Sequence, residues 1–132
     1  MTTPAEDGLR RWHAVAAAKD AAALVDLVAA DAVFHSPAMF GPQEGRDLVV
    51  AYLGAALRVL GVDFHYERSW TNPTGAVLEF RSVVGGREIH GVDIIEFTPE
   101  GTISDFTVMV RPLSALTTLV EHMGAELARM SD

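Results

Sequence analysis

Cysteine is absent from this chain of 132 residues. Disulfide scaffolds, thiolate nucleophiles and cysteine-ligated zinc sites are therefore excluded. Positive charge is also scarce, because ten Lys and Arg residues stand against eighteen Asp and Glu residues, and the formal net charge is −8. A negatively charged surface has the wrong sign for a nucleic-acid groove, so we expect no nucleic-acid partner.

Long apolar runs are missing as well. No stretch approaches the roughly 18–20 uninterrupted apolar residues that span a bilayer, so no membrane partner is expected. The opening segment, MTTPAEDGLRRW, contains acidic residues and no apolar core, unlike a secretory signal. These features favour a cytoplasmic protein, and a composition rich in alanine and arginine but poor in lysine favours a bacterial source.

What is present is an ordinary globular composition. Hydrophobic residues make up 49% of the chain and charged residues 21%, which argues against a disordered or fibrous protein. The length matches one domain and is sufficient to bury a core without disulfides or metals. We therefore expect a single domain over residues 1–132.

Apolar residues at helical spacing dominate the first half of the chain. They predict helices over residues 7–19, 21–29 and 46–60. Residues 32–37, AVFHSP, predict a short strand that ends at a proline, and a glycine- and proline-containing loop follows over residues 38–45.

The second half of the chain changes to the pattern of strands. Strands are predicted over residues 63–71, 76–84, 88–98 and 102–110, and a final helix over residues 114–130. Because the turns between the strands are short, we expect an antiparallel meander in an α+β fold. Such a curved antiparallel sheet can wrap around the N-terminal helices as a cone-shaped α+β barrel with a C-terminal helix. Its concave interior is expected to hold an apolar pocket.

The turn at Gly85 and Gly86 sets the register of one hairpin. It pairs Leu78 with Asp93 and Phe80 with Gly91, so these four residues share one face of the sheet. For the preceding strand two faces remain open, because a slip of one residue exchanges them. The pocket is lined either by Phe64, Tyr66, Arg68 and Trp70 or by His65, Glu67 and Ser69. We choose the first set, because its aromatic residues better match an apolar cavity.

Five segments carry a resemblance to a known family. They are the helix–strand join DAAALVDLVAADAVFHSP, the helix opener EGRD, the hairpin GGREIHGVDIIEF, the turn PEGTISDF and the closing run VMVRPLSALTTLVEHMGAEL. With these segments the chain resembles the nuclear transport factor 2-like superfamily, in its SnoaL-like branch. That superfamily includes ketosteroid isomerases, limonene-epoxide hydrolases, dehydratases, polyketide cyclases and pocketed proteins without a known reaction, so the resemblance implies a fold more than an activity.

The ketosteroid isomerase site carries over only in part. The resemblance places its oxyanion-hole acid on Asp93 and the tyrosine of its first helix on Trp12, whose indole can donate a hydrogen bond. Its general base falls on Ser36, where the isomerases have Asp-Pro. Because an unassisted serine hydroxyl cannot replace a carboxylate as a base, steroid isomerisation by that mechanism is not expected. His35 is an alternative base, as in SnoaL-like cyclases, but its place next to Ser36 on a strand turns it to the other face.

Asp93 is the strongest candidate for chemistry, because it is a carboxylate within an apolar strand. Burial would raise its pKa and suit it to act as a general acid or base. One hypothesis is therefore an isomerase, cyclase, dehydratase or hydrolase for a small hydrophobic molecule. The alternative is a structural aspartate, bonded to Trp12, an arginine or backbone amides, in a non-catalytic ligand-binding or dimerisation domain.

The pocket is expected between the first helix, the third helix and the concave face of the sheet. Its predicted walls are Trp12, Ser36, Phe40, Tyr52, Tyr66, Phe80, Phe106 and Val108. No metal or organic cofactor is expected, because the chain lacks ligand spacings such as HxxxH and a glycine-rich phosphate loop.

The opposite face of the sheet is expected to mediate a homodimer. It carries a mixture of apolar and polar side chains suited to a twofold interface, namely Val77, Val83, Val92 and Ile94 beside Glu79, Arg81 and His90.

Overall fold

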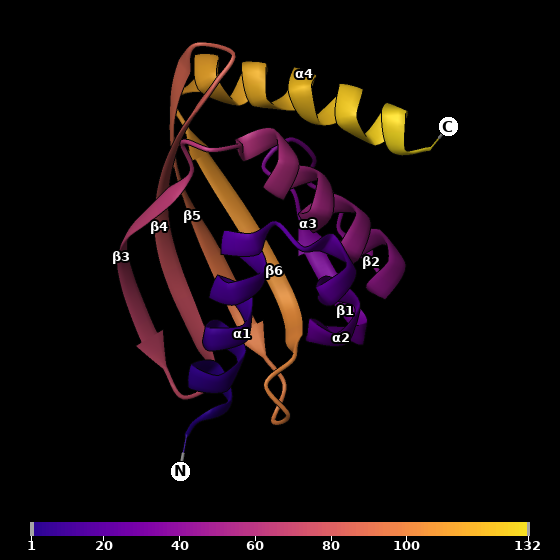
Figure 1. The fold of residues 1–132 in the computed structure, drawn as a ribbon, viewed down its shortest axis with the longest axis vertical. Helices are drawn as coiled ribbons and strands as arrows, with labels where there is room; N and C mark the ends of the chain where they lie inside the picture. Colours follow the sequence, from indigo (N-terminus) through magenta and orange to yellow (C-terminus); the bar gives the residue numbers. More distant parts are fainter. Residues whose placement is uncertain (1, 132) are drawn as a thin grey trace.

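A curved sheet of six strands forms the framework of the structure, a computed structural model that describes residues 2–131 (Figure 1). The strand order is β2-β1-β6-β5-β4-β3. The last four strands in the chain are antiparallel neighbours, which confirms the predicted meander, whereas β1 pairs in parallel with β6. The strands are β1 (Val28–His35), β2 (Gln43–Glu44), β3 (His65–Asn72), β4 (Gly75–Val84), β5 (Arg87–Phe97) and β6 (Ile103–Arg111).

The helices cover the concave side of this sheet. Figure 1 shows α1, α2 and α3 within the curve, and α4 crossing one end of the sheet and running beside α3. Within residues 2–131, no helix combines the length and the apolar character needed to cross a bilayer. The helices are α1 (Pro4–Ala18), α2 (Leu24–Leu27), α3 (Arg46–Leu60) and α4 (Leu113–Met130), with one 3₁₀ turn at Ala21–Ala23. The α+β class and the cone shape of the prediction are confirmed.

The predicted helix over residues 21–29 is shorter in the structure. Helix α2 ends at Leu27, and Val28 already starts β1, where it pairs with Ile103 of β6. Pairing with a neighbouring strand outweighs the local helical pattern, since valine also favours extended backbone. The two-residue strand β2 lies in the segment that was expected to be a loop, so it was not predicted. It pairs with Val33 and Phe34 of β1.

The hairpin of β4 and β5 has the register that the sequence predicts. Leu78 pairs with Asp93 and Phe80 with Gly91, and both turn glycines have positive φ angles, 56° at Gly85 and 77° at Gly86. Such a turn matches the twist of the two strands. Asp93 therefore faces the concave side of the sheet.

A bulge in β3 corrects the prediction for that strand. Tyr66 pairs with Phe80, but the next recorded pair is Ser69 with Leu78, so β3 contains one extra residue. The extra residue exchanges the two faces beyond the bulge. Phe64 and Tyr66 face the interior as predicted, whereas Arg68 and Trp70 lie on the convex side.

The core fills the space between the helices and the concave face. Its larger part joins α1, α2 and α3 to the middle of the sheet, and a smaller part lies under α4. Phe106 and Leu53 represent the first part and Phe80 and Leu119 the second, all nearly inaccessible to solvent. A cavity between these parts positions the candidate site.

Candidate acid–base site in an apolar cavity

A cavity of about 240 Å³ lies between α1, α3, α4 and the concave face of the sheet. Most of its wall consists of hydrocarbon side chains. The exceptions are the polar groups of Trp12, Ser36, Tyr52, Tyr66 and Asp93. Because so few polar groups interrupt the wall, each of them defines where a polar atom of a ligand can bind.

Asp93 is the only residue with a carboxyl group among those that line the cavity. It lies in the middle of β5, between Leu78 of β4 and Val108 of β6, and its residue surface is 5% exposed. Burial raises the pKa of Asp93 from 3.8 to about 7, although a hydrogen bond from Tyr66 opposes this shift. Charged and neutral forms of Asp93 are therefore both populated near neutral pH.

A chain of hydrogen bonds leads from α1 to this carboxyl group. Trp12 Nε1 donates to Tyr66 Oη at 2.9 Å, and Tyr66 Oη donates to Asp93 Oδ2 at 2.5 Å. Burial and the nearby Asp93 raise the pKa of Tyr66 well above its usual value, so its hydroxyl keeps its proton. Since Oδ2 already accepts a hydrogen bond, Oδ1 is the oxygen left to exchange a proton with a ligand.

Aromatic packing holds the tyrosine in this position. The ring of Phe64 meets the Tyr66 ring edge-on, with centroids 4.8 Å apart, and the Phe80 ring lies 6.5 Å away. On the α1 side, His13 contacts the same ring at 5.4 Å, and burial lowers the pKa of this histidine. The hydroxyl is therefore fixed by its ring as well as by its hydrogen bonds.

Ser36 follows β1 directly and lies on the cavity wall. Its Oγ accepts a hydrogen bond from the backbone N–H of Ala38 at 3.0 Å. The hydroxyl proton is still available to donate to a ligand, whereas a lone pair of the oxygen is engaged with the backbone. Ser36 is thus a hydroxyl donor at the position where the resemblance to ketosteroid isomerases implies a carboxylate base.

The structure places seven of the eight predicted wall residues around the cavity, together with Asp93. Phe40 is the exception and corrects the prediction, because its side chain is fully exposed. The loop turns away from the cavity after Met39, so Ala38 and Met39 form the wall there. The seven are Trp12, Ser36, Tyr52, Tyr66, Phe80, Phe106 and Val108.

Helix α4 also lines the cavity, although the sequence pattern did not predict this. The residues are Leu119, Val120, Met123, Gly124 and Leu127. Apolar residues at helical spacing are the available signal, but the same pattern is typical of any helix that packs on a core. The Trp12–Tyr66 bond was missed because it joins positions 54 residues apart.

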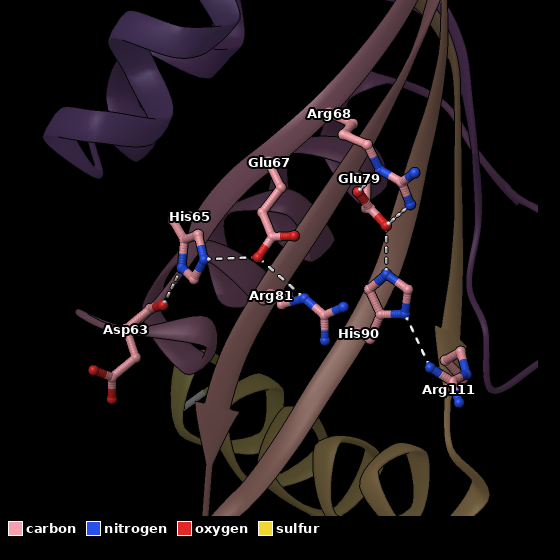
Figure 2. Close-up of polar contacts among 8 residues, drawn as sticks. All are labelled: Asp63, His65, Glu67, Arg68, Glu79, Arg81, His90 and Arg111. Carbon is pink, nitrogen blue, oxygen red and sulfur yellow. Dashed lines mark hydrogen bonds and ion pairs between the residues drawn. The ribbon is translucent and has the colours of Figure 1, made fainter.

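The convex face carries a separate polar network, shown in Figure 2. Arg68 donates to both carboxylate oxygens of Glu79, at 2.6 and 2.7 Å, and His90 Nε2 lies 2.7 Å from the same carboxylate. These contacts, first of all those of Arg68, lower the pKa of Glu79 to about 2. Arg111 approaches His90 Nδ1 at 3.2 Å and can only donate, so His90 holds its proton on Nε2.

Glu79 is covered almost completely by these partners, since only 3% of its surface is exposed. Glu67 pairs with Arg81 at 3.1 Å beside this network, and both side chains remain partly accessible. Over the described range 2–131, no three acidic or histidine side chains are grouped so that they could hold a metal ion.

A curved sheet that wraps around helices is the fold of the nuclear transport factor 2-like superfamily, to which this chain belongs. Within it the chain belongs to the SnoaL-like family, since residues 9–106 match the SnoaL-like domain. No curated protein matches the chain in sequence.

Solved structures of similar proteins agree with this assignment. A steroid delta-isomerase from Pseudomonas aeruginosa is 41% identical, with a TM-score of 0.92 over 96% of this chain and 93% of that one. An uncharacterised protein with a cystatin-like fold from Silicibacter pomeroyi is 33% identical, with a TM-score of 0.84 over 89% of this chain and 83% of that one. An NTF2-like protein of unknown function from Mesorhizobium loti shares the fold, at 22% identity and a TM-score of 0.74 over 83% of this chain and 92% of that one.

Proposed function

We propose that the cavity binds a small, mainly apolar ketone and that Asp93 moves a proton on it, in an isomerase-type reaction. The observation that carries the proposal is a lone carboxyl group, buried in an apolar wall, with a pKa of about 7. A group with this pKa serves both as base and as acid at neutral pH. The 41% identity with a steroid delta-isomerase supports the same reaction class.

The proposed reaction is a proton shift between two carbon atoms of the ligand. Asp93 Oδ1 takes a proton from the carbon next to the carbonyl, and the electron pair of that C–H bond forms an enolate. The neutral carboxyl then returns the proton to the far carbon of the conjugated system, which moves the double bond and restores the carboxylate. Ser36 supplies a hydroxyl donor in the same cavity for the developing negative charge on oxygen.

Tyr66 and Trp12 are positioning residues in this scheme. Tyr66 directs its proton to Oδ2, which leaves Oδ1 for the substrate, and Trp12 fixes the direction of the tyrosine hydroxyl. A single carboxyl group takes and returns the proton, because Ser36 cannot serve as the second one.

A non-catalytic binding domain is the alternative. The replacement of the isomerase base by Ser36 favours it, because a pocket that only holds a ligand needs no base. In that case Asp93 and Ser36 would bind a polar atom of the ligand, and no bond to hydrogen would change.

One experiment separates the two functions. The wild-type protein and the variants Asp93→Asn and Ser36→Ala are incubated in D₂O with unconjugated cyclic ketones, including a ketosteroid. Absorbance follows formation of the conjugated enone, and NMR follows deuterium incorporation. Quenching of Trp12 fluorescence in a Trp70→Phe background measures binding, because Trp12 lines the cavity and Trp70 lies on the convex side.

We expect turnover by the wild type and a turnover rate at least a hundredfold lower in Asp93→Asn, with near-normal ligand binding by that variant. Ser36→Ala should lose less turnover than Asp93→Asn, because the Ser36 hydroxyl only donates a hydrogen bond and does not move the proton. Equal, negligible turnover in the wild type and Asp93→Asn, with binding intact, would favour the alternative.

We also infer that a second copy of the chain covers the convex face. Trp70 and Met109 are 53% and 56% exposed there, which is unusual for large apolar side chains. Within one subunit, the carboxylate of Glu79 already pairs with the charged Arg68 and lies within hydrogen-bond distance of His90 Nε2. Burial of this face against a twofold partner would therefore leave the carboxylate of Glu79 paired.

A further inference from the structure

Gly124 lies at the mouth of the cavity. It lines the cavity and is also exposed to solvent, and the same holds for Ala38, Met39 and Val120. Asp93 lies at the buried end. The opening therefore passes between the loop after β1 and the middle of α4.

Neither packing nor backbone geometry explains a glycine at this position. A Cβ atom added at Gly124 would meet no atom within 4 Å, whereas one at Gly91 would lie 2.5 Å from the Phe80 ring. The φ angle of Gly124 is also not positive, so the backbone there does not require glycine. A glycine inside a helix destabilises it relative to alanine, so the structure carries this cost without a contact that needs it.

The rim around Gly124 is apolar. Its neighbours along the opening are Met39, Val120 and Leu127, and no residue that lines the cavity has a charged side chain except Asp93. Glu126 on the same helix pairs with Arg58 of α3 and with Arg129. A group that reaches the opening along the cavity wall therefore meets apolar side chains, not charged ones.

We propose that Gly124 is a specificity-determining residue, which leaves room at the mouth for an apolar extension of the ligand. The inference rests on the proposed function for its orientation, in which the polar group of the ligand binds at Asp93. The ligand class is then a molecule with one oxygen function at one end and a hydrocarbon tail at the other. The tail lies against the backbone of α4 at Gly124, where any side chain would block it.

A series of 4-alkylphenols with ethyl, butyl, hexyl and octyl chains tests the proposal. The phenol hydroxyl can bind at Asp93, and only the chain length changes. Dissociation constants are measured by calorimetry for the wild type, Gly124→Phe, Gly124→Leu and Ala125→Phe. Ala125 is the matched control, because it is the next residue of α4, exposed, and outside the cavity wall.

For the wild type we expect affinity to rise about three- to fourfold for each added methylene until the chain leaves the opening. Gly124→Phe should bind 4-ethylphenol within twofold of the wild type but the hexyl and octyl compounds at least tenfold more weakly. Gly124→Leu should show the same pattern with a helix-favouring residue, and Ala125→Phe should match the wild type. Circular dichroism checks that each variant is folded.

The proposal would be overturned by equal effects on short and long chains, by the same loss in Ala125→Phe, or by no dependence of wild-type affinity on chain length. The proposed reaction fails separately, if Asp93→Asn leaves turnover unchanged while the chain-length pattern persists. A wild type that binds no alkylphenol of any length would overturn the assignment of Gly124 as well.

Discussion

Tyr66 Oη donates a hydrogen bond to Asp93 Oδ2 at 2.5 Å, across 27 positions of the chain. The bond stabilises the charged form of Asp93, while burial favours the neutral form. Burial is the larger effect, so the pKa stays near 7 and does not return to 3.8. Tyr66 therefore limits how far the pKa of the carboxyl group can rise.

Tyr66→Phe should raise the pKa of Asp93 further, above about 7, because it removes the bond that favours the carboxylate. The variant should also lose about 1–3 kcal/mol of stability, since Trp12 Nε1 loses its acceptor inside the protein. Denaturant unfolding measures the stability, and carboxyl NMR measures the pKa. An unchanged or lower pKa in Tyr66→Phe would show that this hydrogen bond does not govern Asp93.

The raised pKa of Asp93 predicts how stability changes with pH. The native state holds the proton more tightly than the unfolded state, so the favourable contribution is complete below pH 3.8 and is lost as the pH rises to about 7. Relative to Asp93→Asn, wild-type stability should fall by about 1.4 kcal/mol per pH unit between these limits. Urea unfolding of both proteins at several pH values checks the slope; parallel curves would contradict it.

The register of the β4–β5 hairpin was predictable because its turn is short. Two glycines fix which residues face each other, and Asp93, Leu78 and Phe80 follow from the alternation of a strand. The faces of β3 beyond Tyr66 were not predictable, because nothing in the local sequence marks the extra residue of the bulge. Arg68 can donate to Glu79 because the bulge places the Arg68 side chain on the convex face.

The candidate site also contains residues that the sequence predicted and residues that it did not. Asp93 is visible in the sequence as a charge among apolar residues of one strand. Its partner Tyr66 and the donor Trp12 come from β3 and α1, and only the folded chain brings them together. Phe40 is misplaced for the opposite reason, because a loop residue has no periodic pattern that says which way its side chain points.

Gly124→Ala should make the protein more stable by about 0.5–1 kcal/mol, because alanine is the better helix former and its methyl group meets no other atom. Thermal and urea unfolding at one pH measure the change. Ala125→Gly on the same helix should have the opposite sign and a similar size. A destabilised Gly124→Ala would mean that the helix needs glycine for its own packing.

Trp70→Glu should convert the expected homodimer into a monomer, because it places a charge within the apolar part of the convex face. Light scattering at micromolar concentration gives the mass of the wild type and the variant. Val62→Glu is the control, since Val62 is 91% exposed and precedes β3. A wild-type protein with the mass of a monomer would refute the inferred interface.

The ionisation of Asp93 is the central claim, and a carboxyl NMR titration measures it directly. Protein labelled with ¹³C at aspartate is titrated from pH 3 to 9, and Asp93→Asn identifies the resonance. The structure predicts a midpoint of about 7, well above the ordinary value of 3.8. A midpoint near the ordinary value of 3.8 would contradict a buried acid–base group and, with it, the proposed reaction.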